Sequence, residues 1–210
     1  MIYTCYFKLS SNNYHQLFNE NPKVYHKYLA ASQNNLGLLY FTIHDYDSCE
    51  VYSNLALNNY EYLPNQTPNL YTEDMAKIYN NLGNLYRETQ NYKNSEKFYK
   101  LSLKKYEELF KNTPETYRVE LAATLNNFSY LYAGAKKYSK AIEMINKAIA
   151  LMPTEANFYD SKGEILLMQG KDQEALDMWK KVLELDPNFL DNYPDGSNLS
   201  NGLKKLGLIE

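Results

Sequence analysis

A short asparagine-rich motif recurs at a fixed interval and limits what this chain can fold into. Related forms of Asn-Asn-Leu-Gly-Asn-Leu-Tyr stand at residues 34–40, 80–86 and 126–132. The fourth position of the motif holds Gly37, Gly83 and Ser129, each 46 residues from the next. A block that returns at a constant period is typical of proteins that stack one structural unit against the next. We therefore interpret the 210-residue chain as an array of repeats.

The apolar pattern predicts that every unit is helical. From about Asn21 onward, apolar residues return at the three-and-four spacing of a helix, and no long alternating pattern indicates a strand. Pro22, Pro68 and Pro114 each follow Asn or Thr, which is a helix start signal, and they too lie 46 residues apart. The predicted helices are 2–18, 22–43, 46–63, 69–89, 92–111, 114–135, 138–151, 155–169, 171–185 and 199–206, with a turn at 192–196.

The same period predicts the domain organisation. Asn12-Asn13-Tyr14 matches Asn58-Asn59-Tyr60 at the same offset, so residues 1–20 are expected to be the unaccompanied second helix of a partial repeat. The units that follow are repeat 1 at 21–67, repeat 2 at 68–113, repeat 3 at 114–153, repeat 4 at 154–187, and a closing turn and helix at 188–210. Gly163 follows Ser129 by only 34 residues, so the last unit is shorter. We expect the longer units to extend the end of the second helix and the start of the next first helix.

Composition argues against several classes of partner and location. The net charge is -3, and no long run of one sign provides the basic face that nucleic acid or an anionic membrane needs. No apolar run approaches the ~20 residues of a membrane span. Cys5 and Cys49 have no metal-ligand spacing, which favours a reducing, cytoplasmic setting and no metal site.

Together these positions resemble the tetratricopeptide repeat, whose pattern places small residues where two helices approach closely. The small positions of the first helices hold Gly37, Gly83, Ser129 and Gly163. Those of the second helices hold Cys49, Ser95, Ala141 and Ala175, and then Ala56, Ser102, Ala148 and Val182. The usual Trp position departs from the pattern, with Gln33, Tyr79, Leu125 and Tyr159. The resemblance implies an all-α fold, a right-handed α-solenoid of stacked antiparallel helix pairs. The 46-residue units further resemble the extended repeats of kinesin light chains.

The resemblance also implies a function, because in this family the first helices line a concave groove. The chain is expected to be a non-catalytic protein–protein interaction scaffold that binds a peptide or a helix there. The groove-facing positions carry Asn34, Asn35, Leu38, Lys77, Asn80, Asn81, Asn84, Arg87, Asn126, Asn127 and Tyr130. Asparagine offers a donor and an acceptor, so a row of them can pair with the backbone of an extended peptide. The alternative is that one Asn of each pair bridges neighbouring helices structurally.

The sequence also suggests two other binding sites. Some family members hold a terminal carboxylate with Lys, Asn and Arg, and Lys77, Asn81 and Asn127 fit parts of that set. Asn34 and Ala123 stand where further basic residues would be, so the set is incomplete. The first helix carries Tyr3, Tyr6, Phe7 and Leu9, which predict an apolar face for a homodimer or a partner helix. The alternatives are that this helix folds back or frays, or that upstream sequence is missing.

Catalytic and cofactor sites are not predicted. His15, His26 and His44 lie apart in the sequence and are interpreted as surface or rim histidines. No phosphate-binding glycine motif occurs. Asp191, Asp195 and Gly196 resemble a calcium loop only faintly, because Pro194 interrupts it and Gly202 replaces the bidentate Glu. The alternative function is a fragment or regulatory subunit of a larger sensor whose upstream part is absent.

Overall fold

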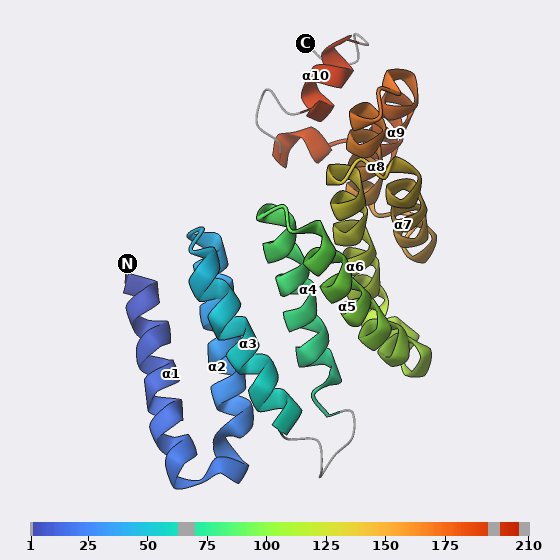
Figure 1. The fold of residues 1–210 in the computed structure, drawn as a ribbon. Helices are drawn as coiled ribbons and strands as arrows, with labels where there is room; N and C mark the ends of the chain where they lie inside the picture. Colours follow the sequence, from blue (N-terminus) through green and yellow to red (C-terminus); the bar gives the residue numbers. More distant parts are fainter. Residues whose placement is uncertain (1, 63–69, 193–197, 206–210) are drawn as a thin grey trace. The chain divides into compact units, whose positions relative to one another are not determined.

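The computed structural model describes residues 2–62, 70–192 and 198–205, and its regular structure there is entirely helical (Figure 1). The α-helices are α1 Ile2–Glu20, α2 Pro22–Thr42, α3 Tyr46–Tyr62, α4 Thr72–Glu88, α5 Tyr92–Asn112, α6 Pro114–Gly134, α7 Tyr138–Leu151, α8 Ala156–Met168, α9 Asp172–Leu185 and α10 Asn198–Lys205. A short 3-10 helix, η1, covers Phe189–Asn192. The predicted all-α fold class is therefore confirmed.

The chain forms two compact units, Met1–Asn112 and Thr113–Glu210, in which neighbouring helices pack in pairs. In the first unit α2 pairs with α3 and α4 with α5, while α1 lies against α2 and α3 contacts α4 (Figure 1). In the second unit α6 pairs with α7 and α8 with α9, and α10 lies against α8 and α9. Short turns join the two helices of each pair, which makes the partners antiparallel. Each unit is thus a short stack of helix hairpins.

Most predicted helix limits agree with the structure to within two residues, but the start of α4 does not. The helix begins at Thr72 rather than 69, because residues 70–71 form a turn. Pro68, the expected start signal, lies outside the described residues. Glu73 and Asp74 occupy the first turn of α4, where negative charge interacts favourably with the helix dipole. The turn predicted at 192–196 also lies almost wholly outside the described residues.

Helix length follows the change in repeat period. α5 and α6 each have 21 residues, whereas α8 has 13 and α9 has 14. At the junction of α5 and α6 the extra residues therefore extend the helices themselves, as the spacing predicted, whereas α3 and α4 have only 17 residues each. The assignment of individual repeat boundaries stays a prediction.

The turn inside each hairpin has the same backbone geometry. One residue of each turn adopts the left-handed conformation: His44 at φ 59°, Gln90 at 57°, Lys136 at 57° and Gly170 at 80°. Near the first of them, the amide of His44 donates to the carbonyl of Phe41 and that of Asp45 donates to Tyr40. These two bonds form a Schellman motif, which satisfies carbonyls at the end of a helix. Only the last turn uses glycine, the residue that adopts this conformation without steric cost.

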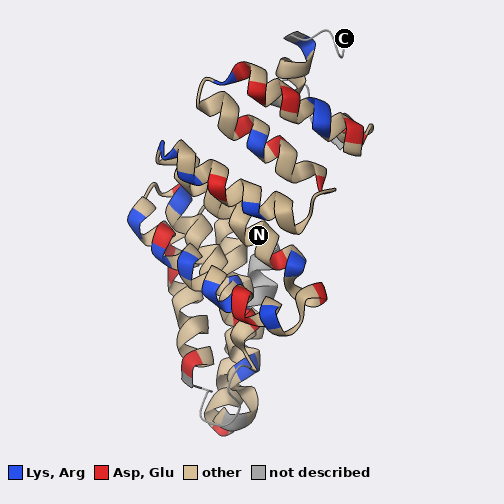
Figure 2. Ribbon diagram, turned by 90° about the vertical axis from the view of Figure 1, so that its right-hand side faces the viewer, with Lys and Arg blue, Asp and Glu red and all other residues tan. Residues whose placement is uncertain are grey.

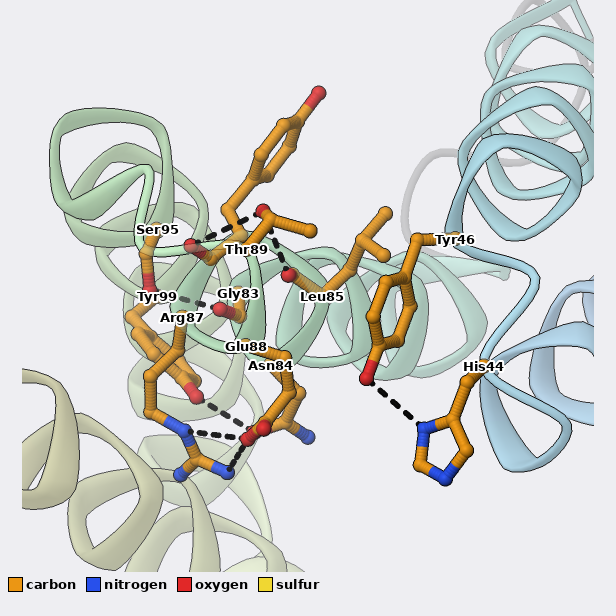
Figure 3. Close-up of polar contacts among 11 residues, drawn as sticks. His44, Tyr46, Gly83, Asn84, Leu85, Arg87, Glu88, Thr89, Ser95 and Tyr99 are labelled. Atoms are coloured by element: carbon orange, nitrogen blue, oxygen red, sulfur yellow. Dashed lines mark hydrogen bonds and ion pairs between the residues drawn. The ribbon is translucent and has the colours of Figure 1, made fainter.

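The small positions predicted from the repeat lie at the contacts between paired helices. A Cβ atom placed on Gly83 would stand 2.7 Å from the ring of Tyr99, and one on Gly163 would stand 2.5 Å from Nε1 of Trp179. Ser95 is fully buried, and its hydroxyl donates to the carbonyl of Gly83 at 2.7 Å (Figure 3). Ser102 likewise donates to Ala76 at 2.9 Å. The helices approach closely because these positions carry almost no side chain.

Candidate functional site: the exposed faces of the first helices

The repeated motif divides each first helix into a packed side and an exposed edge. On α4, Leu82 and Leu85 are buried, and Asn81 and Asn84 are only partly buried. This division follows from helical geometry, because residues three and four apart share a face. The asparagines of the motif therefore lie at the border between the helix contacts and the solvent.

The first asparagine of each pair is turned towards the protein. The side-chain carbonyl oxygens of Asn34 and Asn126 are buried and accept no hydrogen bond from any described residue. An unsatisfied buried acceptor costs about 1–3 kcal/mol, so these two residues do not stabilise the hairpins by bridging helices through that oxygen. Asn80, at the matching position of α4, is partly buried and takes part in internal contacts.

The second asparagine is the more available member of the pair. Asn35 is exposed and Asn81 is partly buried, and neither forms a side-chain hydrogen bond with any described residue. Asn127 on α6 is also partly buried but has internal contacts. Asn35 and Asn81 belong to one compact unit, in which α2 and α4 contact each other. Asn127 belongs to the other unit, so a continuous ladder through all three residues stays a prediction.

Other predicted site residues of α4 are engaged within the protein. Asn84 accepts a hydrogen bond of 2.6 Å from the hydroxyl of Tyr99, which reaches across from α5 (Figure 3). Arg87 donates to the adjacent Glu88 through Nε and Nη2. Lys77 forms an ion pair with Glu73 one helical turn earlier. Exposed pairs of this kind contribute little to stability, so Lys77 and Arg87 can exchange partners more cheaply than Asn84.

Tyr130 on α6 is another predicted site residue that is engaged within the protein. Its hydroxyl donates to Oε2 of Glu164 on α8 at 2.6 Å. Burial and the nearby Glu164 carboxylate raise the pKa of Tyr130, so the phenol remains protonated. The pair connects two first helices within the second unit, which gives Tyr130 a structural role.

An exposed apolar stripe on α2 was missed by the sequence analysis, apart from Leu38. The side chains of Val24, Tyr28 and Leu38 are 47%, 43% and 40% exposed. With Ala31 and Asn35 they follow a four-three-four-three spacing along one face of the helix. The spacing was visible in the sequence, but it did not show that this side of α2 is left uncovered. We call these five residues the α2 stripe.

The terminal-carboxylate set and the apolar face of the first helix gain no direct support. Lys77 is paired with Glu73, and Asn127 lies in a different unit from Lys77 and Asn81. Leu9 on α1 is 55% exposed. The side chains of Tyr3, Tyr6 and Phe7 lie outside the described part of the structure, so dimerisation through α1 stays a prediction.

The interpretation of the histidines was correct for two and wrong for one. His15 and His44 are exposed, and Nδ1 of His44 lies 3.0 Å from the hydroxyl of Tyr46 (Figure 3). His26 is only 5% exposed, packed edge-on against Phe18 of α1 with ring centroids 4.5 Å apart. It was expected at the surface because it stands near a helix start, but α1 folds over this end of α2. Burial lowers the pKa of His26.

Metal, membrane and charge-driven sites gain no support from the described residues. Within residues 2–62, 70–192 and 198–205, no three His, Cys, Asp or Glu side chains are grouped as a metal site would require. Asp195 and Gly196 of the faint calcium loop lie outside those ranges. In the same ranges no helix combines the length and apolar character needed to cross a membrane. Charges of both signs are scattered over the ribbon (Figure 2).

Comparison with known proteins finds one matching family model and solved structures of similar fold. A family model described as the tetratricopeptide repeat matches residues 74–154. The solved structure of BtubC (BKLC) from P. vanneervenii is similar at a TM-score of 0.73 and 18% identity, covering 97% of this chain and 80% of that one. PilF of Pseudomonas aeruginosa is similar at a TM-score of 0.58 and 17% identity, covering 85% of this chain and 69% of that one. At these identities the two structures support the fold alone. No curated protein matches the sequence significantly.

Proposed function

We propose that this chain, which is a tetratricopeptide repeat protein, binds a segment of a partner protein along the exposed faces of its first helices. Proteins of this family are generally interaction scaffolds without catalytic activity, and their stacked repeats present extended surfaces. The narrower resemblance to kinesin light chains carries no part of the proposal.

One observation supports this choice of surface above the others. On α2 and α4, which contact each other, some amide side chains stand at the edge of the helix without a hydrogen-bond partner among the described residues. Asn35 and Asn81 are the two clearest examples, since neither forms a side-chain hydrogen bond among the described residues. A side-chain amide can donate and accept at once, which suits the backbone of a bound polypeptide.

The remaining predicted residues are assigned different roles in this proposal. Lys77 and Arg87 lie on the same helix as Asn81 and add exposed or partly exposed positive charge, and each forms an ion pair with a neighbouring glutamate. Tyr130 and Asn84 act indirectly, because their hydrogen bonds hold the helices that carry the surface. Asn126 and Asn34 present no free oxygen to a partner, since their carbonyls are buried.

A non-enzymatic role and a cytoplasmic location remain part of the proposal. The thiol of Cys49 is free and buried, and burial raises its pKa to about 11, which makes it a poor nucleophile. A free thiol is compatible with a reducing compartment. The homodimer through α1 is kept as a separate hypothesis, testable by sedimentation of the intact chain.

The test is a pulldown that compares two double variants of the intact protein. The first changes Asn81→Ala and Asn127→Ala on the first helices. The matched control changes Asn54→Ala and Asn146→Ala, two exposed asparagines on the second helices α3 and α7. We expect the first variant to lose captured partners that the control retains. Equal capture by both variants, with unchanged circular dichroism, would move the binding surface away from the first helices.

A further inference from the structure

The α2 stripe has the spacing of a helix-pairing seam. Val24, Tyr28, Ala31, Asn35 and Leu38 are separated by four, three, four and three residues. This is the spacing of the a and d positions of a coiled coil, at which one helix packs its side chains between those of another. Fourteen residues at 1.5 Å each make a seam of about 21 Å, or two heptads. The stripe therefore matches a helix better than it matches an extended strand.

The seam is exposed although α2 is packed on its other sides. Leu36 and Ala30, which point inward, are fully buried, whereas Val24 and Leu38 retain 47% and 40% of their exposure. Tyr28 stacks on Tyr14 of α1 at 5.8 Å and is still 43% exposed. The stripe therefore keeps much of its surface exposed beside α1 and α3, the two main neighbours of α2.

The corresponding face of α4 shows that exposure of this kind is not required by the fold. Positions 46 residues after the α2 stripe carry Leu70, Asp74, Lys77, Asn81 and Asn84. Leu70 lies in the turn before α4 and is itself 60% exposed, whereas from Asp74 onward the positions carry charged or amide side chains. Large apolar groups at the same positions of α2 therefore indicate a surface that is covered by another molecule.

The polar member of the stripe also fits a helical partner. Asn35 lies between Ala31 and Leu38, at a position where coiled coils place a single asparagine to fix the register and number of the helices. It is exposed and forms no side-chain hydrogen bond with a described residue. A polar side chain opposite it in the partner would satisfy both groups.

The positive charge beside the stripe indicates the sign of the partner's charge. α2 carries Lys23 and Lys27 and no acidic residue, although its amino-terminal end favours negative charge. The ammonium of Lys27 lies 4.8 Å from the ring centre of Tyr28, directly beside the stripe. Among the described residues Lys27 forms no ion pair, unlike Lys77, Lys100 and Lys147 on other helices. Acidic residues flanking an apolar seam would complement this end of α2.

We propose that the α2 stripe binds an acidic amphipathic helix of a partner protein. This rests on the proposed function and specifies the class of partner for the part of that surface on α2. The partner contributes two to three heptads with apolar residues at a and d, a polar residue opposite Asn35, and Glu or Asp at the flanking positions near Lys27.

The test uses a synthetic probe rather than an unknown ligand. The probe is a fluorescent helix of about three heptads with Leu at a and d, one Asn at a central a position and Glu at e and g. A second peptide has the same composition in scrambled order, and a third has Lys in place of Glu. Fluorescence anisotropy with the intact chain should show binding of the acidic helix, weaker binding of the basic helix, and none of the scrambled peptide.

Matched variants locate the binding on α2. Leu38→Asp should weaken binding of the acidic probe about tenfold or more, because an apolar contact is replaced by a charge that repels the probe. Leu55→Asp on α3 is the control, since both leucines are 40% exposed. Lys27→Glu should reverse the preference between the acidic and basic probes. Equal effects of Leu38→Asp and Leu55→Asp, or equal binding of all three peptides, would overturn the proposal.

Two further outcomes separate this proposal from the proposed function. If Asn81→Ala with Asn127→Ala abolishes partner capture while Leu38→Asp leaves both capture and probe binding unchanged, the scaffold function stands and the acidic helix is wrong. If the intact chain sediments as a dimer that Leu38→Asp dissociates, the stripe is covered by a second copy, which also contradicts it.

Discussion

The hairpins α2/α3 and α4/α5 belong to the same unit, yet they agree on one side and differ on the other. On the packed side, Gly37 and Gly83 both lie where an added Cβ atom would meet the second helix within 3 Å. On the exposed side, α2 carries the apolar stripe and α4 carries charged and amide residues. The repeat therefore constrains the packed side of each hairpin, because the close approach of the two helices depends on the residues there. The residues on the exposed side are free of that constraint, so their differences indicate which partners bind there.

The largest expected effect comes from filling the packed side. Gly83→Leu would force a branched side chain against the ring of Tyr99, which is fully buried. Overpacking of this kind costs roughly 1–3 kcal/mol or more. Urea unfolding followed by circular dichroism should therefore show a lower midpoint. An unchanged midpoint would mean that the Gly83 position is not a helix contact.

Replacing each glycine with alanine should show that the two hairpins respond differently. In Gly83→Ala the new Cβ stands 2.7 Å from an aromatic ring, whereas in Gly37→Ala it stands 2.8 Å from the hydroxyl oxygen of Ser53, which can rotate away. Alanine in a helix interior also gains about 0.5–1 kcal/mol over glycine. We expect Gly37→Ala to be neutral or stabilising and Gly83→Ala to lower the free energy of unfolding. The same sign for both would show that the two contacts are equivalent.

Removing the hydroxyl of Tyr99 should have a moderate effect. Tyr99→Phe loses the 2.6 Å hydrogen bond to Asn84 and leaves the ring in place. A neutral hydrogen bond contributes about 0.5–1.5 kcal/mol to stability. Tyr52→Phe is the control, because the hydroxyl of Tyr52 forms no hydrogen bond with a described residue. Equal melting temperatures for the two variants would contradict the structural role assigned to Asn84.

The smallest expected effect is a pH dependence confined to the α1/α2/α3 region. Burial lowers the pKa of His26 below its ordinary 6.5, so the unfolded chain binds more protons than the folded one at mildly acidic pH. This part of the stability is complete above about pH 6.5 and is lost as the pH falls below it. Hydrogen exchange, corrected for the intrinsic exchange rate at each pH, should therefore show a lower free energy of opening for α1 and α2 at pH 5.5 than at pH 7.5. In His26→Phe that difference should shrink, and persistence of the full difference would assign it to another group.

The sequence predicted the packed side of the molecule well and the exposed side only partly. Gly83 and Ser95 were placed at a helix contact because helices require small residues at fixed spacing where they approach. The start of helix α4 was predicted too early, because a proline signal is local and does not show where the preceding loop ends. The burial of His26 and the exposure of the α2 stripe depend on which neighbouring helix covers a given face. That is a property of the tertiary arrangement, which periodicity within one helix does not determine.

The most direct test of the account is site-specific photocrosslinking in cells that express the intact chain. A photoreactive phenylalanine derivative replaces one residue at a time: Leu38 on α2 and Asn81 on α4 test the first helices, and Leu55 and Val51 on α3 are the controls. The account predicts discrete crosslinked species from Leu38 and Asn81 and none from Leu55 or Val51. Crosslinks that form from α3 but not from α2 or α4 would contradict the claim that partners bind the exposed faces of the first helices.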